Sequence, residues 1–144
     1  MYARAKQLDG VPDGEGTDLV SVVRAAKELG CIPANLIEQV TYSIDDMPTA
    51  LLDGPQIVGM EITDEHNDCD PVTGRIAEYA APKNIGGHAV LWNFFDVDGA
   101  EGVGWQGSWG MSWGCQNPRF RGMGRMSVAQ ARRQFQYAII LKRP

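Results

Sequence analysis

Two stretches of the sequence decide the fold: GGHAV at residues 86–90 and GSWGMSWG at residues 107–114. The first places two glycines and a histidine at the start of an apolar run, which predicts a buried strand over 89–95. Asp98-Gly99 then predicts a hairpin turn that leads into a second strand over 103–106. Neither stretch is specific alone, but the two in this order are informative.

The rest of the sequence predicts helices first and strands later, which is typical of an α+β protein. Thr17 is the expected N-cap of a helix whose apolar stripe is Leu19, Val22, Val23, Ala26 and Leu29, and Gly30 is its expected end. The other expected elements are short helices over 2–8, 34–40 and 47–52, strands over 57–62, 120–126 and 138–142, an acidic loop over 64–74, and a short surface helix or turn over 127–136.

Composition bounds the classes of function. A chain of 144 residues predicts one domain, and a net charge of -5 argues against binding to a phosphate backbone. The basic residues Arg132, Arg133, Lys142 and Arg143 are expected on the solvated surface. The sequence holds no apolar run of 18 residues and no secretion signal, so we expect no membrane partner, and a soluble protein that is cytoplasmic or virion-associated. Nothing in it indicates a cofactor.

Together the two stretches resemble the papain family of cysteine peptidases, whose histidine motif reads GGHAV and whose asparagine motif reads NSWGTSWG. Residues 50–60 are similar to the family's A-L-x-x-G-P-V-x-V-G-I strand, residues 122–126 to its G-Y-G-R strand, and residues 17–33 to a segment of bacterial members. The resemblance covers almost the whole chain. It implies a papain-like α+β fold, truncated at its N-terminal edge, in one domain with a mainly helical part over 1–53 and an antiparallel β-rich lobe over 54–144.

The resemblance also implies the roles of four positions. His88 occupies the position of the general acid/base, and Trp109 that of the tryptophan that shields the imidazole from water. Gly107 stands at the position of the asparagine that orients the imidazole, and it has no side chain to do so. Gln106 is a weak substitute, because neighbouring side chains in a strand point to opposite faces.

The nucleophile is the larger departure from the family. Its cysteine motif, C-G-[SA]-C-[WY], lies well upstream of the histidine, and no such motif is present here. Residues 1–8 resemble the last turns of the helix that the nucleophile would begin. Cys31 follows a helix C-terminus, where the dipole disfavours a thiolate, so we expect a packing role. Cys115 is also expected to be structural. Cys69 lies in the acidic loop, where it could pair with His66 on a transition metal, but the spacing offers no further ligands. Three free thiols are favoured over one disulfide.

Two further patterns have alternative interpretations. The acidic run from Asp64 to Asp70 suggests a metal loop, but Cys69 and Arg75 occupy the EF-hand positions that need glycine and a carboxylate, so a solvated loop without metal is favoured. Tryptophans in a glycine-rich sheet could form a ligand platform, although a core role is more common. These four tryptophans are Trp92, Trp105, Trp109 and Trp113.

The sequence therefore predicts one of two functions. The favoured one is a catalytically incomplete papain-like domain that acts in binding or assembly, for instance in a phage particle. Its protein partner or second copy would use the groove left by the shortened central helix. The alternative is the C-terminal part of an active cysteine peptidase, with a nucleophile supplied by an upstream segment or another chain.

Overall fold

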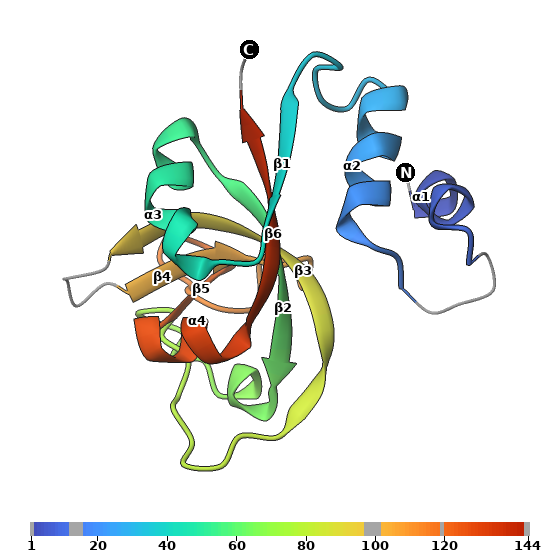
Figure 1. The fold of residues 1–144 in the computed structure, drawn as a ribbon. Helices are drawn as coiled ribbons and strands as arrows, with labels where there is room; N and C mark the ends of the chain where they lie inside the picture. Colours follow the sequence, from blue (N-terminus) through green and yellow to red (C-terminus); the bar gives the residue numbers. More distant parts are fainter. Residues whose placement is uncertain (1, 12–15, 97–101, 119, 143–144) are drawn as a thin grey trace.

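The computed structural model describes residues 2–11, 16–96, 102–118 and 120–142. Two helices come first, the later helices are interspersed with strands, and the strands form one sheet (Figure 1). The elements are α1 (Tyr2–Asp9), α2 (Leu19–Glu28), β1 (Ile37–Thr41), the 3-10 turn η1 (Ile44–Asp46), α3 (Met47–Ala50), η2 (Leu51–Asp53), β2 (Gln56–Thr63), η3 (Asp64–Asn67), β3 (Asn84–Asp96), β4 (Gly102–Gln106), β5 (Met123–Met126), α4 (Val128–Gln134) and β6 (Phe135–Lys142).

The sheet has six antiparallel strands in the order β1-β6-β2-β3-β4-β5. Helices α1 and α2 lie together on one side of it, and α3 and α4 lie on the other (Figure 1). Strand β3 pairs with β2 from Asn84 to Trp92, but it pairs with β4 only from Leu91 onward. Among the described strands, its first half therefore has a partner on one side alone, and His88 lies in that half.

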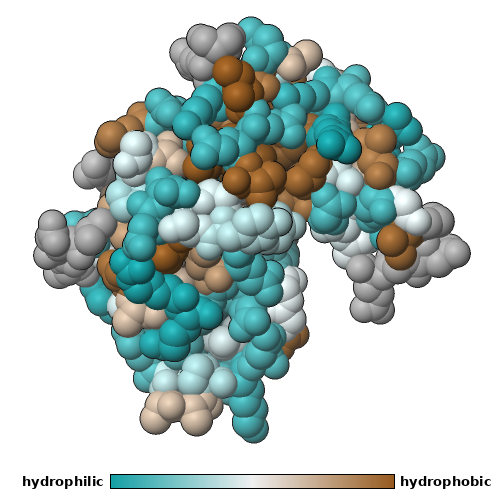
Figure 2. Space-filling model, viewed as in Figure 1, coloured by the Kyte–Doolittle hydropathy of each residue, from teal (hydrophilic) through white to brown (hydrophobic). Residues whose placement is uncertain are grey.

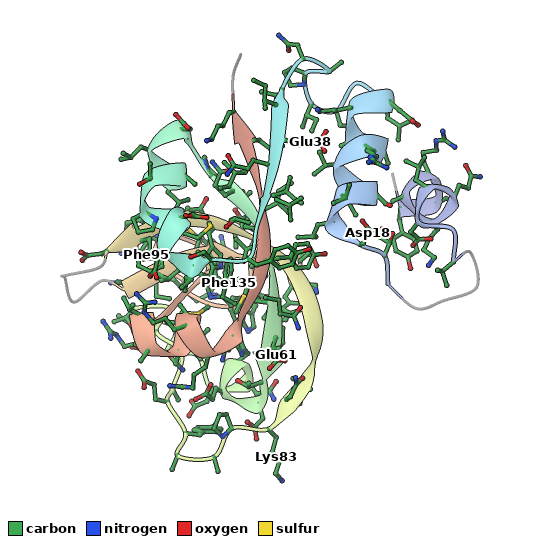
Figure 3. All side chains as sticks on the ribbon, in the orientation of Figure 1. Asp18, Glu38, Glu61, Lys83, Phe95 and Phe135 are labelled. Carbon is green, nitrogen blue, oxygen red and sulfur yellow. The ribbon has the colours of Figure 1, made fainter. Side chains whose placement is uncertain are left out.

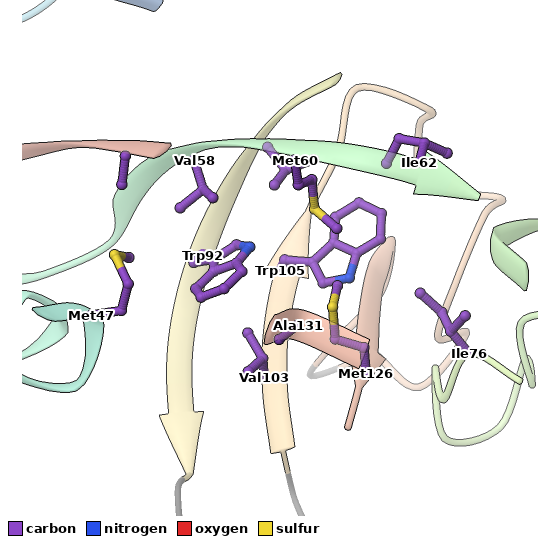
Figure 4. Packing of buried hydrophobic residues seen from close by; sticks show 12 residues of the cluster. Met47, Val58, Met60, Ile62, Ile76, Trp92, Val103, Trp105, Met126 and Ala131 are labelled. Atoms are coloured by element: carbon purple, nitrogen blue, oxygen red, sulfur yellow. The ribbon is translucent and has the colours of Figure 1, made fainter. Parts of the chain in front are cut away.

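The main core fills the space between the sheet and the helices α3 and α4 (Figure 4). Two indoles, Trp92 and Trp105, are completely buried there beside Met47, Met60 and Met126. A second and smaller cluster attaches α2 to the other face through Leu19, Val23 and Ile139. Since this second cluster is small, the helical pair leaves much of that face uncovered.

Helix α2 forms largely as expected, with one correction at its start. Asp18, not Thr17, is the N-cap, because its carboxylate accepts a hydrogen bond from the backbone N–H of Ser21 at 2.9 Å. Gly30, with a φ of 70°, ends the helix as predicted. The expected apolar stripe ends before Leu29, which is 54% exposed.

The predicted helix over 34–40 is wrong. These residues lead into β1, which pairs with β6 in the register Ile37↔Lys142 to Thr41↔Ala138. Three of its five residues, Ile37, Val40 and Thr41, are β-branched and favour a strand. The ladder with β6 satisfies a backbone that a helix of seven residues could not have stabilised alone.

The other elements follow the predictions with shifted ends. The helix over 47–52 is the run η1-α3-η2, and the strands over 57–62 and 103–106 are β2 and β4. The strand over 120–126 is shorter than predicted, and those over 89–95 and 138–142 are longer. Ser127 caps α4, which buries Gln130 and Gln134 and so is not simply a surface helix. The predicted turn at Asp98-Gly99 lies outside the described residues.

The acidic loop is not fully solvated, which corrects the sequence-based expectation. Its first residues form η3, where Glu65 is 0% exposed and His66 is 2% exposed. The Glu65 carboxylate accepts hydrogen bonds from the Thr63 hydroxyl (2.9 Å), the Gln134 amide (3.0 Å) and the Tyr79 backbone (2.8 Å). Because a buried carboxylate is costly without such donors, the network explains how it can lie in the core.

Glycines of the 107–114 stretch give a test of this packing. A Cβ at Gly114 would lie 2.4 Å from the Met123 carbonyl oxygen, whereas one at Gly110 would meet nothing within 4 Å, and both residues have positive φ. We predict that Gly110→Ala lowers the free energy of unfolding by about 1–2 kcal/mol, the cost of a left-handed backbone. Gly114→Ala should lower it by about 3 kcal/mol or more, since it adds a backbone clash. Chemical denaturation measures both, and equal losses would contradict the described loop.

Candidate functional site

His88 is the centre of the candidate site. It lies on the first half of β3 opposite Met60, and its side chain is half-buried. Its Nε2 atom is 3.4 Å from the Ser108 hydroxyl oxygen. Burial lowers the pKa of His88 below its ordinary value of 6.5, so the imidazole is neutral at pH 7. A neutral imidazole can accept a proton, as a general base must.

Trp109 determines the plane of the His88 ring. The two rings are stacked with an interplanar angle of 9° and centroids 5.3 Å apart. Three other rings hold the indole of Trp109 edge-on: Trp113 at 4.7 Å, Trp105 at 5.6 Å and His66 at 6.1 Å. Trp109 thus lies against His88 and is 37% exposed, and the shielding role expected of it stays a prediction.

The structure brings Ser108, not Gln106 or Gly107, to the imidazole nitrogen. Gln106 is exposed at the end of β4, and among the described residues its side chain has no hydrogen bond to His88. Gly107 places no atom there, and a Cβ at this position would lie 3.0 Å from the Trp105 ring. Sequence reasoning missed Ser108, although it is the first polar side chain after Gln106.

A groove of about 480 Å³ opens between the helical pair and the sheet. The space-filling view shows it as a notch beside the helices, and Asp18 lies at the end of α2 nearest the sheet (Figures 2 and 3). His88 lines this groove, and so do the ion-paired side chains of Lys6 and Asp9, with 3.0 Å between Nζ and Oδ2. The other lining residues are Val11, Gly16, Thr17, Asp18, Leu19, Gly59, Gly87, Ala89, Gln136 and Tyr137.

None of the cysteines lines the groove, as far as the described residues show. All three are free thiols, as expected. Cys31 is exposed beyond α2, so the packing role expected for it is wrong. The thiols of Cys69 and Cys115 donate hydrogen bonds to the carbonyls of Gly74 (3.2 Å) and Val72 (3.3 Å). Burial, followed by the nearby Asp70, raises the pKa of Cys69 to about 11, which keeps it a thiol.

His66 is a second histidine near the site, with its ring centroid 6.1 Å from that of Trp109. Its Nδ1 atom contacts the backbone of Thr63, whereas its buried Nε2 atom has no hydrogen-bond partner among the described residues. Burial lowers its pKa more than the Thr63 backbone and the Glu65 charge raise it. Within the described residues, no group of three His, Cys, Asp or Glu side chains could hold a metal ion.

The arrangement provides a proton acceptor without a partner nucleophile among the described lining residues. His88 is neutral, held flat against an indole and placed on the wall of a groove. Thiol catalysis would also need a thiolate within hydrogen-bond reach of the imidazole.

None of the described helices is long and apolar enough to span a membrane.

Acid should destabilise the protein through its two histidines. A histidine whose folded pKa lies below its unfolded value binds fewer protons in the folded state, so stability falls as the pH drops below about 6.5. We predict a lower free energy of unfolding at pH 5 than at pH 7. NMR titration should show both imidazoles protonating below 6.5. A folded-state pKa above 6.5 for His66 would contradict the described packing.

Comparison with solved structures supports the fold. Xylellain, a cysteine protease from Xylella fastidiosa, matches this chain with a TM-score of 0.53 at 21% sequence identity. The match covers 74% of this chain and 40% of that of xylellain, so the present chain corresponds to less than half of its length. No protein-family model and no curated protein sequence matches the chain. The comparison confirms, at the level of fold, the expected likeness to a papain-like cysteine protease.

Proposed function

We propose that this chain is a papain-like domain that acts by binding or assembly rather than by hydrolysing peptides. The observation that carries the proposal is the surroundings of His88. Its Nε2 atom contacts a serine, its ring is stacked on Trp109, and the described walls of its groove contain no cysteine. Acyl transfer by a thiol requires the imidazole and the thiol to lie together.

The three cysteines of the chain are poor candidates for that thiol. The thiols of Cys69 and Cys115 are hydrogen-bonded to the backbone carbonyls of Gly74 and Val72. Cys31 is exposed beyond the C-terminal end of α2. With a pKa of about 11, Cys69 has a thiolate fraction of about one in ten thousand at pH 7. An ordinary cysteine has a thiolate fraction of a few per cent at this pH.

The groove supports a binding role. It is about 480 Å³ in volume, and its walls combine small residues such as Gly87 and Ala89 with the charges of Lys6, Asp9 and Asp18. The helical pair contacts the sheet through a small cluster, so a polypeptide could enter between them. We propose a protein partner or a second copy as the occupant. A role in a phage particle stays a prediction from the sequence.

Labelling with a thiol electrophile tests the absence of catalysis. Iodoacetamide reacts with each cysteine at a rate that mass spectrometry of the peptides reports. We predict that Cys31 is labelled fastest, that Cys69 is labelled at least about 100-fold more slowly because its thiolate is rare, and that His88→Ala changes no rate by more than about two-fold.

The control is Cys31→Ser, which should remove the fast labelling and leave the other two rates unchanged. A cysteine whose labelling depends on His88 would overturn the proposal. So would cleavage of a peptide library by the wild-type chain that His88→Ala abolishes.

One observation favours a second candidate function. His88 is neutral, oriented and exposed to the groove, which is what a general base needs if a thiol arrives from elsewhere. The chain would then be the C-terminal part of an active cysteine peptidase, completed by an upstream segment or another chain.

The coding sequence upstream of Met1 separates the two candidates. An open frame that encodes a Cys-Trp motif, together with peptidase activity of the longer product, would replace the binding proposal by the peptidase. If no such motif precedes or accompanies the chain, the binding domain is the remaining candidate.

A further inference from the structure

The side chains that hold His88 differ from those that the sequence led us to expect. Among the described residues, the Ser108 hydroxyl contacts the ring at Nε2 and the Trp109 indole is stacked against it. Neither is the amide that Gly107 lacks. The orientation of the imidazole must therefore come from a hydroxyl and a stacked ring.

The stacked ring is itself rigidly placed. Trp109 meets Trp105 at an interplanar angle of 79°, Trp113 at 74° and His66 at 77°. Edge-to-face contacts of this kind each stabilise an indole, so three of them favour one position of the Trp109 ring. Because His88 lies parallel to that indole, the plane of the imidazole is set before any ligand enters the groove.

The orientation of the ring plane does not determine which of the two imidazole nitrogens carries the proton. The Ser108 hydroxyl can influence this choice, since its oxygen lies 3.4 Å from Nε2. This distance is long for a hydrogen bond, so the contact is weak and biases the choice of tautomer without fixing it. Ser108 does not line the groove, whereas His88 does, so the hydroxyl leaves the groove-facing part of the ring free.

The packing of Trp105 explains why an amide is absent. A Cβ at Gly107 would lie 3.0 Å from the Cζ3 atom of Trp105, which is 0% exposed and fixed by its neighbours. A side chain at this position would need the core indole to shift by a few tenths of an ångström. Trp105 therefore leaves little room for a side chain at Gly107, and the side chain of the next residue, Ser108, is the one that contacts the imidazole.

We propose that Ser108 is a positioning residue that accepts a hydrogen bond from Nε2–H of His88 and so presents Nδ1 as an acceptor to the groove. The proposal rests on the proposed function only in taking the groove as the binding site. The group it would receive is a hydrogen-bond donor of a polypeptide partner, such as a hydroxyl, a thiol or an amide N–H.

The test is the tautomer of His88, read from long-range proton–nitrogen NMR spectra of the free protein at pH 8, where the ring is neutral. We expect the Nε2–H form to dominate in the wild type. Ser108→Ala should lower the ratio of Nε2–H to Nδ1–H by about three-fold or more, because it removes the acceptor. Ser108→Thr keeps a hydroxyl and should keep the wild-type ratio.

Two controls separate this role from a structural one. Ser112→Ala removes an exposed hydroxyl from the same loop and should leave the His88 signals unchanged. His66 reports in the same spectrum whether the aromatic packing persists. An unchanged tautomer ratio in Ser108→Ala, or an equal loss in Ser108→Thr, would overturn the proposal. Since no ligand is present, neither result depends on whether the domain binds a partner or hydrolyses peptides.

Discussion

The burial of Trp105 is the constraint on which the rest of the site depends. Its indole is 0% exposed and meets the rings of Trp109, Trp113 and His66. Two glycines make room for it: a Cβ would lie 3.0 Å from the indole at both Gly107 and Gly124. Because interiors are packed closely, a side chain at either position would force a neighbouring indole to shift. The spacing of the glycines and tryptophans over 105–124 is thus one packing arrangement.

This arrangement has a consequence for His88. The same indoles that fill the core also present a flat face on which the imidazole is stacked. Trp105 leaves little room for a side chain at Gly107, where a Cβ would lie 3.0 Å from its ring. The chain therefore keeps a well-oriented histidine on the wall of a groove without the amide that the family resemblance led us to expect. The described cysteines lie away from that groove, and we have proposed binding on this basis.

The sequence predicted much of the fold because its strands are marked by strong local signals. The apolar runs that became β2, β3 and β4, and the glycine that ends α2, act over a few residues. The helix expected over 34–40 failed because its outcome depends on β6, which is about 100 residues away in the sequence. The prediction of a solvated acidic loop was wrong for a similar reason. The buried Glu65 carboxylate is satisfied by donors from Gln134 and Tyr79, which are distant in the sequence.

The sequence pointed to some of the residues of the candidate site. Its motif singled out His88 and Trp109, whose rings are stacked in the structure, and the roles expected of them stay predictions. The motif did not point to Ser108, because nothing in the sequence around a single serine indicates that its hydroxyl contacts a histidine. Nor could it show that Gly107 is bare because of Trp105. The close approach of the two is a feature of the folded structure, in which the Trp105 ring lies 3.0 Å from where a Cβ of Gly107 would be.

The most direct test of this account is a crystal structure at atomic resolution that shows which atoms surround the His88 ring. The account predicts an imidazole within about 20° of parallel to the Trp109 indole, the Ser108 hydroxyl beside Nε2, and no sulfur within about 4 Å of either ring nitrogen. A cysteine sulfur at Nδ1, or an imidazole turned edge-on to Trp109, would contradict it.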